Sequence, residues 1–245
     1  MKKILTILTI ATIAIAFVSC SRGEVKKMPS KMTESFDFSF LDYDVEDVED
    51  VIYEYFYDEQ NRLVKITHTG QSDVNIFYNS DGLPEKVEGL WWVEIPNVDI
   101  IYQDNGKKII LGIDTIWLNE KGQYIKFIRA NIGGWSEFTY NPNGSIAKWI
   151  NAGREETSCS IDGGGCGSGD GTLGEYSDIP AIWRHTNAPD WFIFWLMQNM
   201  LVFPFERTGN IAGWGYMETN TDNYLTKLTS HDSVQIRKYE YILAK

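Results

Sequence analysis

Polar and apolar side chains alternate along short stretches of the chain from about residue 50 onward. Tyr53, Tyr55 and Tyr57 fall on one side of the first stretch, and the residues between them fall on the other. An Asn, Asp or Gly turn follows, and then a second stretch that carries a Lys beside apolar residues. Alternation with period two is typical of β-strands, so each stretch with its turn predicts a hairpin.

This hairpin unit recurs along the chain. Its instances are YFYDEQNRLVKI from Tyr55, IFYNSDGLPEKV from Ile76, IIYQDNGKKIIL from Ile100, IWLNEKGQYIKFI from Ile116 and FTYNPNGSIAKWI from Phe138, with a late variant, GYMETNTDNYLTKL, from Gly215. Gly82, Gly106, Gly122 and Gly144 stand where a hairpin turn needs a residue at positive φ. The repetition predicts one β-rich domain over residues 50–245, built as an antiparallel meander without crossover helices.

One segment near residues 188–203 departs from this pattern and predicts a helix. Asn187 is a suitable N-cap, Pro189 suits a first turn, and Pro204 would end the helix. From Trp191 onward the segment is apolar on nearly every side, so a helix there must be buried. We therefore expect a strongly curved antiparallel sheet, or a partial barrel, with this helix filling or capping it.

The repeated hairpins, the single late helix and the closing strand pair ending in KYEYILAK resemble a lipoprotein domain family catalogued as domain of unknown function 4595. The resemblance covers about residues 50–245 and implies a porin-like fold. The hairpins are also similar to the tyrosine–aspartate repeats of shell-forming toxin proteins, which run to many more copies. The family carries no assigned activity, so the resemblance transfers no functional residue.

The first twenty residues have the layout of a bacterial lipoprotein signal. Lys2 and Lys3 precede an apolar run from Ile4 to Val18, which as a helix would be only about 22 Å long, short for a hydrocarbon core of about 30 Å. The sequence Phe17-Val18-Ser19-Cys20 then resembles a lipobox. Residues 1–19 are thus predicted to be a signal peptide, Cys20 to carry the lipid, and residues 20–49 to form a polar tether.

Ser21 follows the lipidated Cys, where an Asp could retain a lipoprotein at the inner membrane. By this resemblance we expect the protein in the cell envelope at the outer membrane, held by its acyl chains. The face of the membrane from which the domain hangs stays open. The formal net charge of −12 disfavours nucleic acid as a partner.

Two further cysteines, Cys159 and Cys166, lie in a glycine-rich stretch from Ser158 to Pro180 that is expected to be a long loop. In an oxidising periplasm they are a candidate disulfide, with two free thiols as the alternative. Metal binding would need two further ligands, and neither an HExxH nor a nucleophile-elbow motif is present. The sequence therefore predicts no metal and no cofactor.

The nine Trp residues are the remaining chemical signal. Trp91 and Trp92 are consecutive in a strand-like stretch, so they point to opposite faces and one of them is a candidate ligand-facing aromatic. Exposed indoles suit the apolar faces of sugar rings, whereas buried indoles would serve the core. The sequence favours a non-enzymatic module that binds a glycan or a protein. The alternative is a hydrolase that acts on glycans through a pair of carboxylates.

Overall fold

The computed structural model describes residues 26–37, 48–90, 96–129, 134–140, 142, 146–151, 158–160, 164–168, 171–172, 182–199, 215–230 and 234–245. Within these ranges the chain is mainly β, and the predicted antiparallel meander is confirmed. Fourteen strands form one sheet in the order β11-β10-β9-β8-β7-β6-β5-β4-β3-β2-β1-β17-β16-β15. The order follows the sequence except at one place, where β1 pairs with the last strand, β17.

The strands of this sheet have the following bounds: β1 (Lys27–Phe36), β2 (Val51–Tyr57), β3 (Leu63–His68), β4 (Val74–Tyr78), β5 (Pro84–Glu88), β6 (Val98–Gln103), β7 (Lys108–Leu111), β8 (Asp114–Leu118), β9 (Tyr124–Arg129), β10 (Gly134–Tyr140), β11 (Ile146–Asn151), β15 (Gly215–Thr219), β16 (Leu225–Ser230) and β17 (Gln235–Leu243). A 3-10 turn, η1 (Asp104–Gly106), joins β6 to β7. A separate three-stranded sheet contains β12 (Ser158–Ser160), β13 (Gly164–Ser168) and β14 (Gly171–Thr172).

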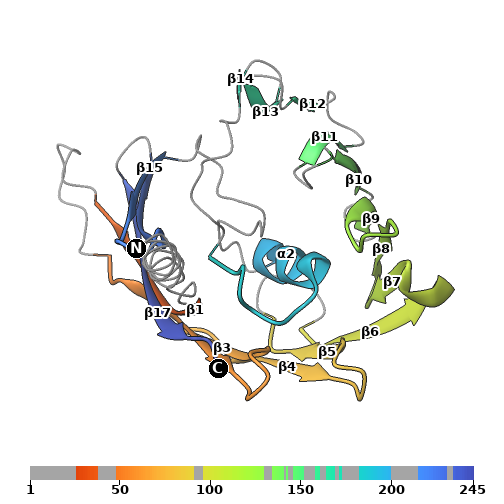
Figure 1. Cartoon of the computed structure of the whole chain (residues 1–245), viewed down its shortest axis with the longest axis horizontal. Coiled ribbons are helices and arrows are strands. Elements are labelled where there is room, and N and C mark those ends of the chain that lie inside the picture. The colour runs from red at the N-terminus through yellow and green to blue at the C-terminus, as the bar shows by residue number, and fades with distance from the viewer. Residues whose placement is uncertain are drawn as a thin grey trace, which may run out of the picture.

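The prediction of a strongly curved sheet or a partial barrel is wrong. The sheet neither closes nor curls strongly, and in the described residues its edges are β11 and β15. Closure would require these two strands to pair in a consistent register. Along the chain they are separated by the small sheet and by helix α2 (Asp190–Asn199), which lies on one face of the large sheet (Figure 1). We call this face inner and the opposite face outer.

Strand β1 lies inside the stretch that was expected to be a polar tether, and the structure corrects that expectation for Lys27–Phe36. The strand is interior to the sheet, between β2 and β17. Met32 and Glu34 are buried on its inner face, where Met32 is the register partner of the buried Tyr239. The segment looks polar in sequence because one of its buried positions carries a charge, which Arg237 of β17 neutralises at 2.6 Å.

Four hairpin turns share one hydrogen-bond pattern. In each, the side-chain Oδ1 of the first residue accepts two bonds of 2.9–3.1 Å, from the backbone N–H groups two and four residues later. These first residues are Asp58, Asn79, Asn119 and Asn220. The fourth residue of each turn has positive φ, and it is Asn61, Gly82, Gly122 or Asn223. Positive φ is confirmed at Gly82, Gly106 and Gly122, whereas Gly144 lies outside the described residues.

A β-bulge follows each of these turns and decides which way the next side chains point. In the first hairpin Tyr57 pairs with Leu63, but Phe56 pairs with Lys65, so Val64 is the extra residue. The bulge places Leu63 on the inner face and Lys65 on the outer face. The same register shift occurs between β4 and β5, between β8 and β9 and between β15 and β16, which explains why each unit repeats an apolar residue, any residue and then Lys.

Tyrosines on the inner face connect neighbouring strands near these turns. The hydroxyl of Tyr78 donates to the carbonyl of Leu63 at 2.8 Å, and the hydroxyl of Tyr102 donates to the carbonyl of Pro84 at 2.8 Å. Tyr241 makes the same bond to Leu225 at 2.6 Å. Leu63, Pro84 and Leu225 each begin a strand directly beside the bulge. The repeated tyrosine therefore satisfies a backbone acceptor next to a place where ladder pairing is interrupted.

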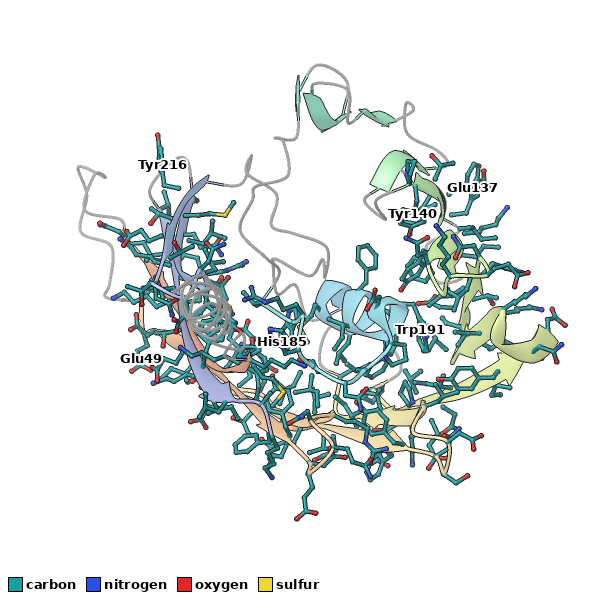
Figure 2. All side chains as sticks on the ribbon, viewed as in Figure 1. Glu49, Glu137, Tyr140, His185, Trp191 and Tyr216 are labelled. Atoms are coloured by element: carbon teal, nitrogen blue, oxygen red, sulfur yellow. The ribbon has the colours of Figure 1, made fainter. Side chains whose placement is uncertain are left out.

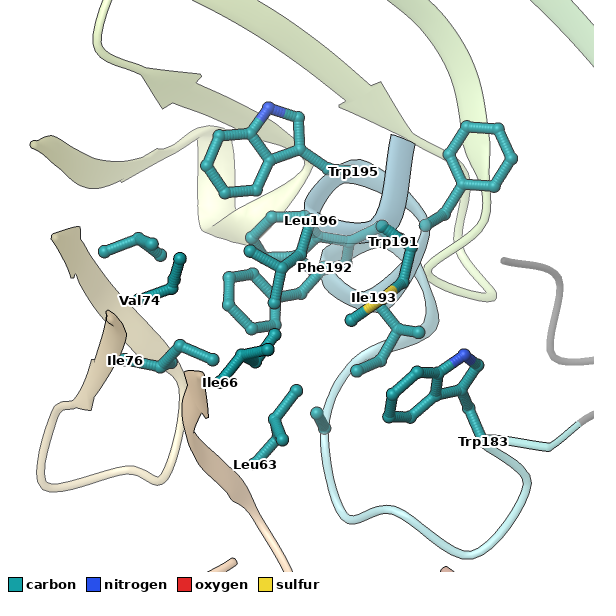
Figure 3. Packing of buried hydrophobic residues seen from close by; sticks show 14 of the residues in the cluster. Leu63, Ile66, Val74, Ile76, Trp183, Trp191, Phe192, Ile193, Trp195 and Leu196 are labelled. Atoms are coloured by element: carbon teal, nitrogen blue, oxygen red, sulfur yellow. The ribbon is translucent and has the colours of Figure 1, made fainter. Parts of the chain in front are cut away.

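Helix α2 confirms the predicted helix near residues 188–203. Every residue from Trp191 to Met197 is buried, and Figure 3 shows Phe192, Ile193 and Leu196 packed over Ile66 and Ile76 of the sheet. The first helical bonds run to the carbonyl of Pro189, so Asn187 lies outside the helix and is not its N-cap. None of the helices in the described residues has the length and apolar character needed to cross a membrane.

Removal of one turn side chain should measure the contribution of this repeated pattern. We expect Asn119→Ala to lower the free energy of unfolding by about 1–2 kcal/mol, because two backbone N–H groups lose their acceptor in an exposed turn. Urea unfolding of residues 21–245, followed by circular dichroism, measures the change. Lys121→Ala in the same turn is the matched control and should be nearly neutral; equal losses in both variants would contradict the assignment.

Candidate functional site

A cavity of about 700 Å³ lies at the edge of the sheet where two hairpin turns meet the segment that leads into α2. Three separate parts of the chain line it: the β2–β3 turn, the β4–β5 turn and residues 187–189. The lining residues are Gln60, Arg62, Asn79, Ser80, Asp81, Gly82, Leu83, Asn187, Ala188 and Pro189. The size is within the range of small-molecule sites in proteins.

Asn187 fixes the distance between the helix lead-in and the first turn. Its backbone N–H donates to the carbonyl of Asn61 at 2.9 Å, and its side-chain amide donates to the carbonyl of Gln60 at 3.2 Å. Asn61 in turn exchanges two 2.9 Å bonds between its side chain and the backbone of Lys245. The wall of the cavity is therefore held by backbone partners and does not depend on a bound ligand for its shape.

Arg62 is the cation among the lining residues, and it is held on two sides. Its Nε donates to Oδ2 of Asp58 at 2.7 Å, and its guanidinium lies 4.5 Å from the ring centroid of Tyr78. Partial burial by itself would raise the pKa of Asp58, but hydrogen bonds from the backbone and side chain of Arg62 outweigh it and lower that pKa. The guanidinium is thus fixed and its charge is balanced locally, while its terminal nitrogens remain beside Gly82.

The rest of the lining offers neutral polar groups. Gln60, Asn79 and Asn187 carry amides and Ser80 carries a hydroxyl, so donors and acceptors are both present. Asp81 is the one carboxylate among the lining residues. Leu83 adds an apolar surface that is 37% exposed. The cavity therefore suits a ligand with hydroxyl or amide groups better than a strongly charged one.

A second polar cluster lies on the inner face across β1, β2, β3 and β17. Oε1 of Glu34 accepts bonds of 2.6 Å from both Arg237 and Gln235. Burial, together with the negative charge of Glu34, raises the pKa of Tyr53 to about 12, and the Tyr53 ring lies 4.4 Å from that of His68. Glu34 and Arg237 are only 10% and 8% exposed at their side chains, so this cluster is closed to solvent and offers no open site.

The structure describes some of the residues predicted from the sequence and not others. Cys20, Trp91 and Trp92 lie outside the described residues, so lipidation and the ligand-facing aromatic stay predictions. Cys159 and Cys166 are register partners on adjacent antiparallel strands, β12 and β13. Directly opposite positions in such a pair have Cα separations of about 4.5–5.5 Å, which a disulfide can span. The disulfide itself stays a prediction.

The structure divides the tryptophans whose side chains it describes into two groups. Trp183, Trp191 and Trp195 are buried, as the core interpretation predicts. Trp117 and Trp135 are half-buried on the outer face. In the described part of the chain, no group of three or more His, Cys, Asp or Glu side chains is arranged to hold a metal ion.

Sequence reasoning missed Arg62 and Asn187. Arg62 occupies the position directly after the positive-φ residue, where the other three turns carry Leu83, Gln123 and Tyr224. The positive charge of Arg62, at a position that is uncharged in the other three turns, was the signal that the sequence offered. Asn187 was noticed, but as a helix cap. Its role in the cavity depends on a contact with a turn more than 120 residues earlier, and local sequence does not reveal such contacts.

Comparison of the sequence with protein-family models finds no match, and comparison with curated proteins finds none either.

The buried tyrosines predict a loss of stability at alkaline pH. Burial raises the pKa of Tyr53, Tyr55, Tyr78 and Tyr239 above their ordinary value of 10.0. A raised pKa means that the fold favours the neutral phenol. The contribution of each buried tyrosine to the free energy of unfolding is therefore complete below pH 10. It is lost as the pH rises toward and beyond about 12.

We expect the urea midpoint to fall steadily above pH 10, and tyrosinate absorbance at 295 nm to rise together with unfolding. An absorbance increase near pH 10 that corresponds to all 13 tyrosines in the folded protein would contradict the burial of these four phenols.

Proposed function

We propose that this protein is a lipid-anchored, non-enzymatic binding module of the bacterial cell envelope, and that the cavity at the hairpin turns takes up a neutral saccharide. The observation that carries the proposal is the cavity itself, which joins three chain segments around amide, hydroxyl and guanidinium groups. Saccharides present hydroxyls that both donate and accept, which matches groups such as those of Gln60, Asn79 and Asn187.

The charges around the cavity favour binding over hydrolysis. A glycosidase needs two carboxyl groups about 5–9 Å apart, one of them kept protonated by a raised pKa. The cavity lining carries a single carboxylate, Asp81. Asp58, the nearest carboxylate behind it, is paired with Arg62 and has a lowered pKa, which suits a fixed counter-ion and not a general acid.

The position in the envelope follows from the N-terminal motif. The apolar run that ends at Cys20 is the support for export and lipidation, and Ser21 favours the outer membrane. The hairpin repeats, the late helix and the closing strands support the resemblance to the lipoprotein domain family of unknown function, although the sheet is not closed as that family's porin-like description implies. A diacylated anchor would hold the domain at the membrane without any need for the sheet to enter lipid.

The anchor can be tested by one substitution. Cys20→Ser should abolish acylation and leave the signal peptide uncut, because it removes the thiol that would carry the acyl chains. Intact-mass measurement should show the acylated, signal-free mass for the unchanged chain only. Ser19→Ala, next to the cysteine, is the control and should remain in the membrane fraction. Detection of the unchanged chain there without any lipid mass would contradict lipidation.

The cavity can be tested by filling it. Ser80→Trp places an indole in the cavity, whereas Glu120→Trp places one at the equivalent position of the β8–β9 turn, outside the cavity. In a thermal-shift screen of residues 21–245 with mono- and oligosaccharides, at least one sugar should stabilise the parent and Glu120→Trp but not Ser80→Trp. A saccharide at 100 times its Kd should add about 2.7 kcal/mol of stability.

Two outcomes of this screen would contradict the proposal. The absence of a shift with every sugar would exclude a saccharide site in the cavity. Recovery of shortened products after incubation, detected by mass spectrometry, would show a hydrolase instead.

A further inference from the structure

The outer face of the sheet is not uniform along its length. Across β6 to β10 the strand registers align Ile101, Ile110, Thr115, Ile128 and Trp135 into one row. The neighbouring row lies closer to the β6–β7 and β8–β9 turns. It contains Gln103, Lys108, Trp117, Lys126 and Glu137. Figure 2 shows Glu137 on the side of β10 that is turned away from α2. A mostly apolar row thus crosses five strands on a face that α2 does not cover.

The other half of the same face carries polar rows with two exposed phenylalanines, Phe56 and Phe77. In the first hairpin Phe56 is 44% exposed, and the Nζ of Lys65 lies over its ring. Lysines lie over the rings of Trp117 and Trp135 in the same way. The register continues from Lys65 to Asn75 and Glu88, so no apolar row adjoins Phe56. In the described strands, an apolar row beside two indoles therefore occurs on β6–β10. The hairpin repeat alone does not produce this combination.

The two indoles have a defined relation to each other. Trp117 lies on β8 and Trp135 on β10, and at about 4.8 Å per strand their strands are about 10 Å apart. Lys126 on β9 lies between them: it is the register partner of Trp117, and its Nζ is 5.3 Å from the ring centroid of Trp135. Lys108 places its Nζ 5.9 Å from Trp117. Both rings are held by neighbours and stay half-exposed.

Lys126, the lysine between the two indoles, is neutralised by an acidic partner. Lys126 pairs with Glu137 at 3.0 Å, and the whole chain carries a formal charge of −12. A polyanion would be repelled by that charge and would find few free cations here. A neutral ligand with flat apolar faces and polar edges fits better, because its faces can pack on the indoles while its hydroxyls meet Lys and Glu side chains.

We infer that the outer face of β6–β10 binds an extended neutral polysaccharide, with Trp117 and Trp135 contacting two sugar residues of one chain. Their strands are about 10 Å apart and the indoles are offset by one row, about 7 Å along the strands, so they lie on a diagonal of about 12 Å that one strand of glycan can bridge. This inference rests on the proposed role as a saccharide-binding module and adds a second surface to it, on the face opposite to α2. The cavity would take a short sugar, and the outer face a polymer.

Affinity electrophoresis of the full chain in detergent micelles tests the inference. The gels contain hydroxyethyl cellulose, xyloglucan, galactomannan or dextran, with polygalacturonate as the polyanion. We expect at least one neutral polymer to retard the parent protein. Trp117→Ala and Trp135→Ala should each weaken binding about tenfold, equivalent to about 1.4 kcal/mol, and the double variant should migrate as in a gel without polymer.

The matched control is Phe56→Ala, which removes an exposed aromatic beneath a lysine on the polar half of the same face and should bind as the parent does. Ser80→Trp should also keep its retardation, so loss of the cavity site and loss of this surface can be told apart. Unchanged retardation of the double variant, or retardation by polygalacturonate alone, would overturn the inference.

A measurement on the unsubstituted protein removes any dependence on variant folding. N-bromosuccinimide oxidises accessible indoles, and peptide mass spectrometry locates the products. The retarding polymer should protect Trp117 and Trp135 from oxidation, whereas the buried Trp183 and Trp195 should react little with or without it. Failure of the polymer to protect the two outer indoles would overturn the inference. Concentration-dependent sedimentation of the parent, lost in the double variant without any glycan binding, would assign the apolar row to self-association instead.

Discussion

The β-bulge that follows the turns at Asp58, Asn79, Asn119 and Asn220 is the feature on which the rest of this structure depends. A regular hairpin would send Lys65 to the same face as Leu63, two residues before it. The extra residue reverses that direction, so an apolar residue faces the core and the following lysine faces outward. It also interrupts the ladder beside Leu63, and the hydroxyl of Tyr78 takes the carbonyl at that position. One local distortion thus sets the sidedness of the sheet and the role of its repeated tyrosine.

The second constraint is the pairing of β1 with β17, which joins strands about 200 residues apart in the interior of the sheet. Because of this pairing, the breaks in the meander fall at β11 and β15 and not at the terminal strands. The chain between those edges supplies α2, whose apolar surface covers the inner face of the middle strands. The open edges and the buried helix are therefore two consequences of where the chain leaves and re-enters the sheet.

These constraints explain what the sequence could and could not predict. The hairpins, the positive φ of Gly82 and Gly122, and the apolar helix are encoded within a dozen residues, so periodicity and turn chemistry predict them. Strand β1 escaped notice because Glu34 occupies a buried position, and its partner Arg237 is 203 residues away. The curvature of the sheet, the cavity between Arg62 and Asn187, and the placement of Trp117 and Trp135 in neighbouring rows all arise from register or from distant contacts. Such features depend on packing between segments and have no local signature.

The charge pattern of the outer face gives the strongest reason to expect neutral ligands. The repeat places a lysine outward on every unit, yet each described pair brings an acidic group to it: Asp73 to Lys65 at 2.6 Å, Glu137 to Lys126 at 3.0 Å and Glu218 to Lys227 at 2.8 Å. Such exposed pairs contribute little to stability. Their effect is to balance these three lysines on a protein that is acidic as a whole. Exposed aromatic side chains then distinguish parts of this surface. Phe56 and Phe77 lie on β2 and β4, whereas Trp117 and Trp135 adjoin an apolar row on β6–β10, which suits the apolar faces of sugar rings better than it suits ions.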